Sequence, residues 1–251
     1  MPETDALNDL IDIGANLGHD SFDADLPEVL SAAQAAGVSR LVLTGATVPG
    51  SVKAAAIAAD YPGLCFSTAG VHPHYARELD DAGVEQLRAL AADEAVVSLG
   101  ECGLDYFRNF STPTDQEAAF HRQLTLAAEL GLPVFLHQRD AIDPFIAIVR
   151  EYRDRLPRAV THCFTGSADD LERCLELDLH IGITGWICDE RRGTHLKALI
   201  KRIPADRLMI ETDAPYLLPR DLSPKPASRR NEPRYLPHVL RAVAAAAGKA
   251  P

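Results

Sequence analysis

VVSLGECGLDYFRNFSTPTDQEAAFHRQLTLAAELGLPVFLH, residues 96–137, holds two short apolar runs on either side of a longer segment rich in helix-forming residues. The apolar runs predict strands at 96–101 and 133–137, and the segment between them predicts a helix at 114–130 that ends at Gly131. This order is typical of two parallel strands joined by a right-handed crossover.

The same alternation runs along the whole chain. The predicted strands are 10–15, 40–44, 65–71, 96–101, 133–137, 159–163, 180–184 and 207–212. The predicted helices are 25–36, 49–60, 83–92, 114–130, 141–155, 168–177, 193–202 and 233–247. Eight such pairs favour a closed (β/α)8 barrel over an open doubly wound sheet, and about 250 residues is the usual size of one barrel. We therefore expect residues 1–251 to form a single α/β domain, a TIM barrel.

The composition is that of a globular protein, with 47% hydrophobic and 24% charged residues. No apolar run approaches the roughly 18 residues of a membrane span, and the acidic N-terminus lacks a signal pattern. We expect a cytoplasmic protein with no membrane partner. The five cysteines lack CxxC spacing and are expected to be reduced thiols. The net charge of -11 argues against non-specific coating of nucleic acid, which depends on cationic contacts to phosphate.

Polar side chains lie where most of the predicted strands end. They are Asn16, His72, His74, Glu101, His137, His162, Glu211 and Asp213. A parallel barrel brings the carboxyl ends of all its strands to one face, so we expect these side chains to converge at its mouth. A divalent cation would compensate the buried carboxylates, and mixed nitrogen and oxygen donors suit a first-row metal or magnesium better than calcium. Taken singly, each histidine has a structural explanation, and Glu101 could be an ion-pair partner of Arg139.

Several long segments of the chain are similar to one known family. They are STAGVHPH (67–74), LGECGLDYFRNFSTP (99–113), VFLHQRDA (134–141), THCFTG (161–166), HIGITGW (180–186) and LMIETDAPYLLPRDLSPKPASRRNEP (208–233). These motifs, in this order and at these separations between about residues 11 and 237, resemble the TatD family of metal-dependent deoxyribonucleases, within the amidohydrolase-like barrels. DIGANL (12–17), CDERRG (188–193) and NEP (231–233) resemble the family's namesake branch rather than its paralogues.

The resemblance implies an enzyme, a magnesium-dependent DNase with manganese or zinc as alternatives and one to two ions bound. The expected activity is 3′-5′ exonuclease action on single-stranded or frayed DNA, with RNA as a further substrate, by a monomer. By position, Glu101, His137, His162 and Asp213 match the family's metal-binding residues. His72 and His74 match the segment beside the scissile phosphate.

The expected mechanism is attack of a metal-activated water on phosphorus. Asp213 is the candidate to orient or deprotonate this water, with Glu211 as its supporting partner or a second ligand. Residues two apart on a strand face the same side, so both carboxylates would face the mouth if the last strand reaches residue 213. If that strand breaks at Thr212, the prediction for Glu211 fails.

The first strand departs from the wider superfamily pattern, in which a D-x-H-x-H motif supplies two histidine ligands. This chain has Asp12, Ile13, Gly14, Ala15 and Asn16 instead. Gly14 cannot bind a metal, and Asn16 offers only an amide oxygen, so one of the two superfamily metal positions is weakened. A second ion would then depend on phosphate oxygens from the substrate.

Basic and aromatic residues follow several strand ends and are candidates for substrate binding. Arg108, Arg139 and Trp186 are the principal ones, beside Asn16, His72 and His74; Arg191, Arg192, Arg229 and Arg230 could complete a cationic rim. Tyr106, Phe107 and Phe110 could stack on bases, although packing is the preferred explanation for Phe107 and Phe110. The proline-rich segment 217–233 predicts a loop over the mouth, either a wall of the groove or a brace for the last helix.

Two other classes of function stay open on the residues alone. One is a metal-dependent hydrolase of a small amide, lactone or phosphoester on the same barrel, which the acidic net charge and the missing histidine motif favour. The other is a binding protein whose barrel has lost its chemistry, which the intact set of Glu101, His137, His162 and Asp213 disfavours.

Overall fold

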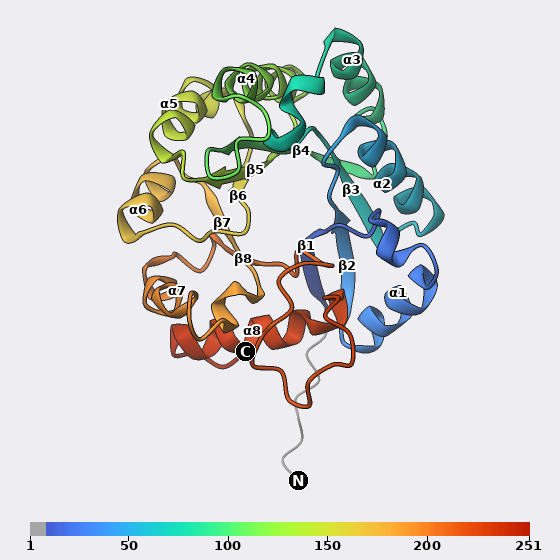
Figure 1. The fold of residues 1–251 in the computed structure, drawn as a ribbon, viewed down its shortest axis with the longest axis vertical. Helices are drawn as coiled ribbons and strands as arrows, with labels where there is room; N and C mark the ends of the chain where they lie inside the picture. The colour runs from blue at the N-terminus through green and yellow to red at the C-terminus, as the bar shows by residue number, and fades with distance from the viewer. Residues whose placement is uncertain (1–8) are drawn as a thin grey trace.

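A computed structural model describes residues 9–251 and contains eight parallel strands in one sheet, in the order β1 to β8 (Figure 1). The strands are β1 (Leu10–Ala15), β2 (Val38–Leu43), β3 (Cys65–Ala69), β4 (Val96–Asp105), β5 (Val134–Arg139), β6 (Ala159–Thr161), β7 (His180–Ile183) and β8 (Leu208–Ile210). Each strand pairs with the next one along the chain. The predicted (β/α)8 barrel is confirmed.

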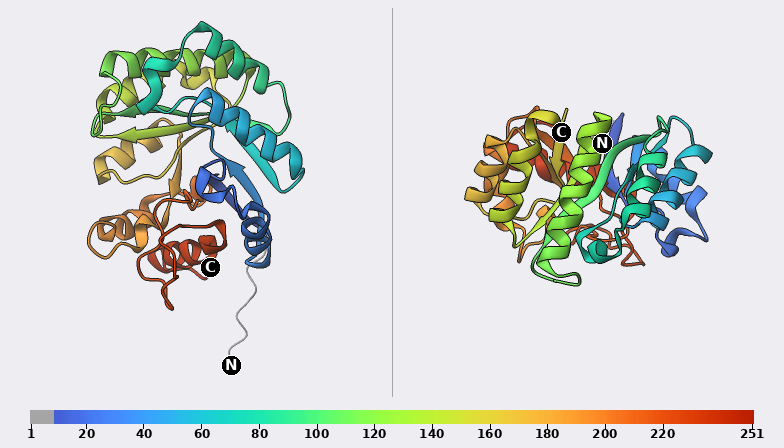
Figure 2. Two further views of the ribbon diagram at one scale, coloured as in Figure 1. Left: turned by 45° about the vertical axis from the view of Figure 1, so that its right-hand side comes forward. Right: turned by 90° about the horizontal axis from the view of Figure 1, so that it is seen from above.

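Eight α-helices surround the strands (Figures 1 and 2). They are α1 (Leu26–Ala35), α2 (Val48–Asp60), α3 (Asp81–Leu90), α4 (Pro113–Leu130), α5 (Ile142–Tyr152), α6 (Ala168–Glu176), α7 (Thr194–Leu199) and α8 (Leu236–Ala247). Short 3-10 helices are η1 (Asp20–Phe22), η2 (Pro73–Glu78), η3 (Arg153–Arg155), η4 (Gly185–Cys188), η5 (Ile200–Arg202) and η6 (Pro233–Tyr235). The three predicted helices at 141–155, 193–202 and 233–247 are therefore each divided into an α-helix and a 3-10 turn.

Local sequence signals explain where the helices begin and end. The Thr112 hydroxyl accepts a hydrogen bond from the Asp115 N–H at the start of α4. Pro113 takes the first helical position, where a backbone N–H would have no acceptor within the helix, so the missing N–H of proline costs nothing. Gly131 closes the same helix in the left-handed conformation. Ser167 and Asp170 form a reciprocal capping box at the start of α6.

The barrel closes between its first and last strands just beyond the end of β8. The Asp213 N–H donates to the Gly14 carbonyl at 2.8 Å, and the Asn16 N–H donates to the Ala214 carbonyl at 2.6 Å. Below these bonds, the buried Asp12 carboxylate accepts from the Thr212 N–H at 2.9 Å. Burial raises the pKa of Asp12 to about 7, against the opposing effect of its hydrogen bonds with Thr212. We call this junction of β1 with residues 211–214 the seam.

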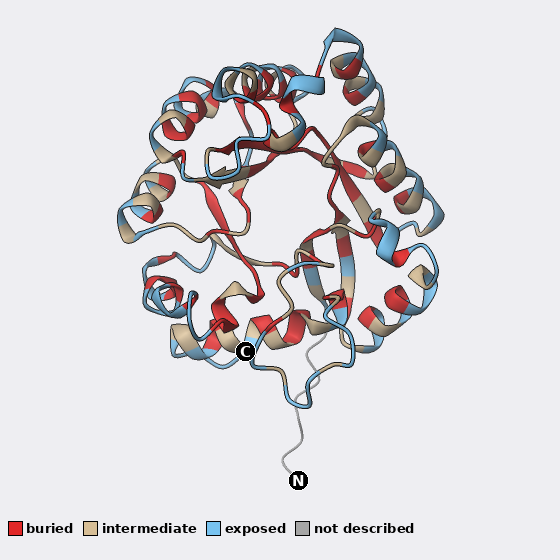
Figure 3. Cartoon of the chain, viewed as in Figure 1, coloured by how far each residue is buried: buried red, intermediate tan, exposed pale blue. Residues whose placement is uncertain are grey.

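Buried side chains line the strands and the inner faces of the helices (Figure 3). One apolar cluster covers most of the barrel from β3 to β7, and a second packs α1 and α2 against β1 and β2. All five cysteines are free thiols, as predicted. Among residues 9–251, no helix is long and apolar enough to cross a membrane.

Candidate active site

Glu101 lies at the centre of a cluster of three histidines at the mouth of the barrel. Its Oε1 atom is 2.7 Å from His162 Nε2, 2.8 Å from His137 Nδ1 and 3.3 Å from His72 Nε2. The four side chains come from β4, the ends of β5 and β6, and the segment after β3. Glu101, His72 and His162 are buried, and the His137 side chain is 18% exposed. The predicted convergence of Glu101, His137 and His162 is therefore present, and it includes His72.

The charges in this cluster compensate one another. Burial alone would raise the pKa of Glu101, but His162, His72 and His137 outweigh it and hold that pKa well below its usual range. Burial likewise opposes protonation of His162, yet the carboxylates of Glu101 and Glu211 hold its pKa well above the usual value. These carboxylates thus favour a positive charge between them. Glu101 makes no ion pair with Arg139, so that simpler explanation of Glu101 is wrong.

Asp105 is a site residue that the sequence analysis missed. Strand β4 runs to residue 105 rather than ending at 101, and this extension brings a buried carboxylate beside the histidines. Asp105 Oδ2 lies 2.8 Å from His74 Nε2 and 3.6 Å from His137 Nε2. Burial would raise the Asp105 pKa, but His137 and His74 outweigh it and lower that pKa. An acidic residue four positions after Glu101 was the available signal.

Asp213 and Asn16 meet on the other side of the mouth, at the seam. The Asn16 amide nitrogen donates to Asp213 Oδ1 at 2.9 Å. Asp213 has a left-handed backbone with φ of 54°, so the last strand does not continue to it. Burial, together with the neighbouring charges of Glu101 and Glu211, raises the pKa of Asp213 to about 7, while His162 acts in the opposite direction.

Glu211 points into the barrel although β8 ends before it, at Ile210. The expectation that an early strand end would turn this side chain away is therefore wrong. Glu211 is fully buried: its Oε1 accepts from the Cys163 N–H at 2.5 Å, and its Oε2 lies 3.4 Å from His162 Nδ1. Backbone hydrogen bonds fix its direction, because the Glu211 N–H still donates to the Ile183 carbonyl.

Two glycines make the space that Glu211 occupies. A Cβ atom at Gly14 would lie 2.5 Å from Glu211 Oε2 and 2.8 Å from Phe135 Cζ, and a Cβ at Gly182 would lie 2.5 Å from Glu211 Oε1. Any larger side chain at residue 14 would collide with the carboxylate. This explains in physical terms why residue 14 is not a metal-binding histidine here: Glu211 fills that position.

Donor atoms without partners test whether the cluster suits a metal. Among the described residues, His137 Nε2, His162 Nδ1 and Glu211 Oε2 are buried and make no hydrogen bond. His72, Glu101 and His137 also each offer a donor atom within 4.8 Å of the others. Imidazole nitrogens and carboxylate oxygens at these separations can serve as ligands of a divalent cation. The residues fit a metal.

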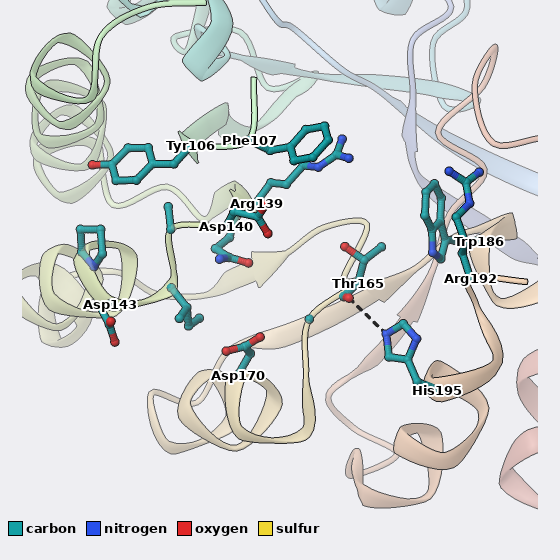
Figure 4. Close-up of a pocket in the computed structure, with 15 residues that line it drawn as sticks. Tyr106, Phe107, Arg139, Asp140, Asp143, Thr165, Asp170, Trp186, Arg192 and His195 are labelled. Carbon is teal, nitrogen blue, oxygen red and sulfur yellow. Dashed lines mark hydrogen bonds between the residues drawn. The ribbon is translucent and has the colours of Figure 1, made fainter. Parts of the chain in front are cut away.

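A pocket of about 600 Å³ is lined by Tyr106 and Gln138, which follow Asp105 and His137 in the sequence, whereas the cluster residues themselves do not line it (Figure 4). Its walls follow β4, β5, β6 and β7 and include Tyr106, Phe107, Arg139, Thr165, Trp186, Arg192 and His195. The Arg139 guanidinium lies 3.9 Å from the Phe107 ring centre, and the Arg192 guanidinium lies 4.4 Å from the Trp186 ring. Each stack presents one cation and one aromatic face to the pocket.

The aromatic residues in this region differ from their predicted roles. Phe107 and Phe110 are 55% and 57% exposed, which excludes core packing, but each ring keeps a loop contact: Phe107 with Arg139, and Phe110 edge to face with His74 at 4.8 Å. The Tyr106 hydroxyl instead donates to Glu117 Oε1 at 2.5 Å, which fixes its ring at the edge of the pocket. Arg108 stands farther from the Phe107 ring, at 5.5 Å.

The long loop after β8 is tied to its surroundings at several points. Arg230 donates to Asp25 and Glu232, and its guanidinium lies over Phe22, so it is a structural residue and not part of a free cationic rim. The Asn231 amide donates to the Thr212 carbonyl at 2.8 Å. These contacts match the brace that the sequence allowed for this loop.

Comparisons with known proteins place these observations in a family. The family model "TatD related DNase" matches residues 11–251. The chain is 56% identical over 236 residues to a protein of Yersinia pseudotuberculosis named "3'-5' ssDNA/RNA exonuclease TatD", an alignment that covers 94% of this chain and 91% of the relative.

Solved structures agree. A TatD family hydrolase from Entamoeba histolytica is 27% identical, with a TM-score of 0.88 over 97% of this chain and 93% of the other. YJJV, a TatD homologue from Escherichia coli, is 28% identical with a TM-score of 0.85, over 94% of this chain and 90% of the other. The chain belongs to the TatD related DNase family.

Proposed function

We propose that this chain is a metal-dependent 3′-5′ exonuclease that removes nucleotides from single-stranded DNA and RNA. The observation that carries the proposal is the arrangement of three histidines around the buried Glu101 carboxylate, next to a pocket with two cation–aromatic stacks. The names of the curated relatives, 54% to 57% identical, support the direction and both substrates. The TatD family is metal-dependent, and for this chain we propose magnesium.

Glu101, His137 and His162 would hold the cation, with Asp213 as a further ligand from the seam. His72 lies close enough to Glu101 to join this set, so its proposed role shifts from substrate contact toward the metal. When bound, the cation would neutralise charge on the phosphate and lower the pKa of water. We propose one tightly held ion in the imidazole cluster and a second, weaker one that depends on the substrate phosphate, because Gly14 and Asn16 supply no imidazole.

Asp213 would orient the attacking water and accept its proton. The Asn16 amide fixes Asp213 Oδ1, which leaves Oδ2 to face the reacting group. Glu211 supports this arrangement from below through the Cys163 N–H and the His162 ring, and we propose a positioning role for it. His74, held by Asp105, would donate a hydrogen bond to the phosphate or the leaving oxygen from the opposite side.

The pocket beside the cluster would bind the end of the strand. Phe107 and Trp186 offer ring faces for stacking on bases, which is tolerant of sequence because every base has such a face. Arg139 and Arg192 stand beside these rings and Arg108 nearby, where they would contact phosphates. Such local cations reconcile a polyanionic substrate with a net charge of -11. Because stacking needs exposed base faces, we propose that this pocket prefers single-stranded DNA or frayed ends.

For the chain as a whole we propose one domain spanning residues 1–251, acting as a monomer in the cytoplasm. This one chain supplies every residue of the proposed centre, so no partner subunit is needed to complete it.

The test is nucleotide release from 5′-labelled and 3′-labelled single-stranded DNA and RNA oligomers with magnesium, manganese, zinc or EDTA. We expect metal-dependent trimming in which the 3′ label leaves first and the 5′-labelled strand shortens stepwise. Glu129→Gln, an exposed carboxylate outside the mouth, serves as the matched control for variants of Glu101. Failure of every metal to support release by folded protein would overturn the nuclease and favour a hydrolase of a small amide, lactone or phosphoester.

A further inference from the structure

A second group of metal-binding side chains lies at the outer rim of the barrel mouth. Cys188 ends η4, Asp221 lies in the loop after β8, and His238 stands in the first turn of α8. Their Sγ, carboxylate and imidazole donor atoms all lie within 4.8 Å of one another, and His238 Nε2 is 2.7 Å from Asp221 Oδ1. Three elements far apart in sequence thus place three different donor types together.

The donors at this rim differ in chemistry from those at the mouth. The mouth cluster offers nitrogen and oxygen atoms, whereas the rim adds a sulfur. Thiolate is a soft ligand that favours zinc and related ions, while magnesium prefers hard donors and gains nothing from a thiolate. Sulfur, imidazole and carboxylate are all established zinc ligands, and donors within 4.8 Å of one another need only small side-chain rotations to converge on one tetrahedral ion.

Two of the three side chains are open to solvent. The Asp221 and His238 side chains are 50% and 30% exposed, so an ion can enter from solvent, while Cys188 is buried at 2% exposure. Binding would replace the thiol proton by the metal and release that proton to solvent, as zinc does at other cysteine ligands.

We propose that Cys188, Asp221 and His238 form a second metal site that takes zinc or another thiophilic divalent cation, with its remaining position open to water. None of these three residues belongs to the proposed exonuclease centre. An ion there would cross-link η4, the long loop and the start of α8. Trp186 belongs to the same 3-10 turn as Cys188, so the ion would also fix one wall of the substrate pocket.

Cobalt substitution tests this site directly, because a cobalt–thiolate bond absorbs in the near ultraviolet and a site of nitrogen and oxygen donors does not. We expect the charge-transfer band in wild-type protein titrated with Co²⁺, and we expect it to persist in Glu101→Gln, where the mouth cluster is damaged. Cys188→Ser should abolish it. Asp221→Asn, at an exposed position where folding is not at risk, should weaken cobalt binding on the order of tenfold or more.

Cys163 is the necessary control, since its backbone contacts Glu211 and its thiol lies near the mouth. The band should survive Cys163→Ser. A band lost in Cys163→Ser but kept in Cys188→Ser would overturn the proposal, as would no band from folded wild-type protein at saturating Co²⁺. As a second readout, zinc should raise the Tm of Glu101→Gln but not of Glu101→Gln/Cys188→Ser. Equal increases in the two would also contradict the rim site.

Discussion

The two sides of the barrel mouth compensate the negative charge of buried carboxylates with different groups. On the side of β3 to β6, Glu101 is surrounded by the imidazoles of His72, His137 and His162. On the side of the seam, Asp213 is held by the Asn16 amide, and Glu211 by a backbone N–H. The first side is built of metal-binding side chains, and the second mostly of groups that also close the barrel.

The number of acidic residues at the mouth therefore does not decide where a cation binds. A carboxylate in a low-dielectric site needs compensation, and both sides provide it. Only the imidazole side provides it with several imidazole ligands, whereas the seam would add the Asp213 carboxylate alone. At the seam, Glu211 takes the space above Gly14 that a superfamily histidine would need. We therefore expect the imidazole side to dominate metal binding and most of the seam to serve barrel closure.

The largest expected effect comes from neutralising the centre of the imidazole side. Glu101→Gln keeps the shape of the side chain but removes the negative charge that three histidines share. We expect nucleotide release to fall on the order of a thousandfold. The buried ring nitrogens would lose their counter-charge, and the cation would lose its central ligand. The measurement is the initial rate of release from a labelled single-stranded oligomer. Activity within about tenfold of wild type would contradict the account.

The next effect concerns the seam and its pH dependence. Asp12 is an acid whose folded pKa of about 7 exceeds its unfolded value, so folded protein keeps a proton that unfolded protein has lost. Stability from this group is complete below the unfolded pKa and is lost as the pH rises toward 7. Relative to Asp12→Asn, wild type should lose about 3 kcal/mol between pH 5 and pH 8. Urea unfolding of both proteins at the two pH values measures this loss. An equal change of unfolding free energy in wild type and Asp12→Asn would refute it.

A smaller effect tests the space around Glu211. Gly14→Ala places a methyl group 2.5 Å from Glu211 Oε2, so we expect a loss of about 1–3 kcal/mol in unfolding free energy. Gly18→Ala is the matched control, because its Cβ would meet only the Lys53 side chain at 3.8 Å. Thermal or urea unfolding compares the two. Equal stability of both variants would show that residue 14 does not shape the Glu211 site.

The smallest effect lies in the pocket outside both sides. Trp186→Ala removes one stacking face and the partner of Arg192, and we expect KM for single-stranded DNA to rise roughly fivefold to tenfold with kcat nearly unchanged. Val52→Ala, an exposed apolar residue on α2, is the control for loss of surface area. Steady-state kinetics separate the two constants. A drop in kcat alone would place Trp186 in the chemical step instead.

The barrel could be predicted from sequence because its signals are local. Most strands and helices have their own pattern of apolar residues, and several helices have their own cap, as Thr112, Pro113 and Gly131 provide for α4. A parallel barrel then brings the strand ends together by topology alone, so the sequence suffices to predict that Glu101, His137 and His162 share one site.

The remainder depended on contacts that no local pattern encodes. Asp105 was missed because the length of β4 depends on its ladder with β5, which continues to Arg139. The direction of Glu211 depends on space left by Gly14 and Gly182, residues distant from it in sequence. The position of Phe107 likewise depends on a contact between its ring and the guanidinium of Arg139 at the end of β5, a residue distant from it in sequence.

Manganese binding, measured by isothermal titration calorimetry, compares the two sides of the mouth most directly. Wild type, Glu101→Gln and Asn16→Ala are titrated in parallel, with folding checked by circular dichroism. We predict one tight site that Glu101→Gln abolishes, whereas Asn16→Ala weakens it by about tenfold or less, since Asn16 would act on the metal only through its hydrogen bond to Asp213. Tight binding that survives Glu101→Gln and disappears in Asn16→Ala would contradict this prediction and move the metal centre to the seam.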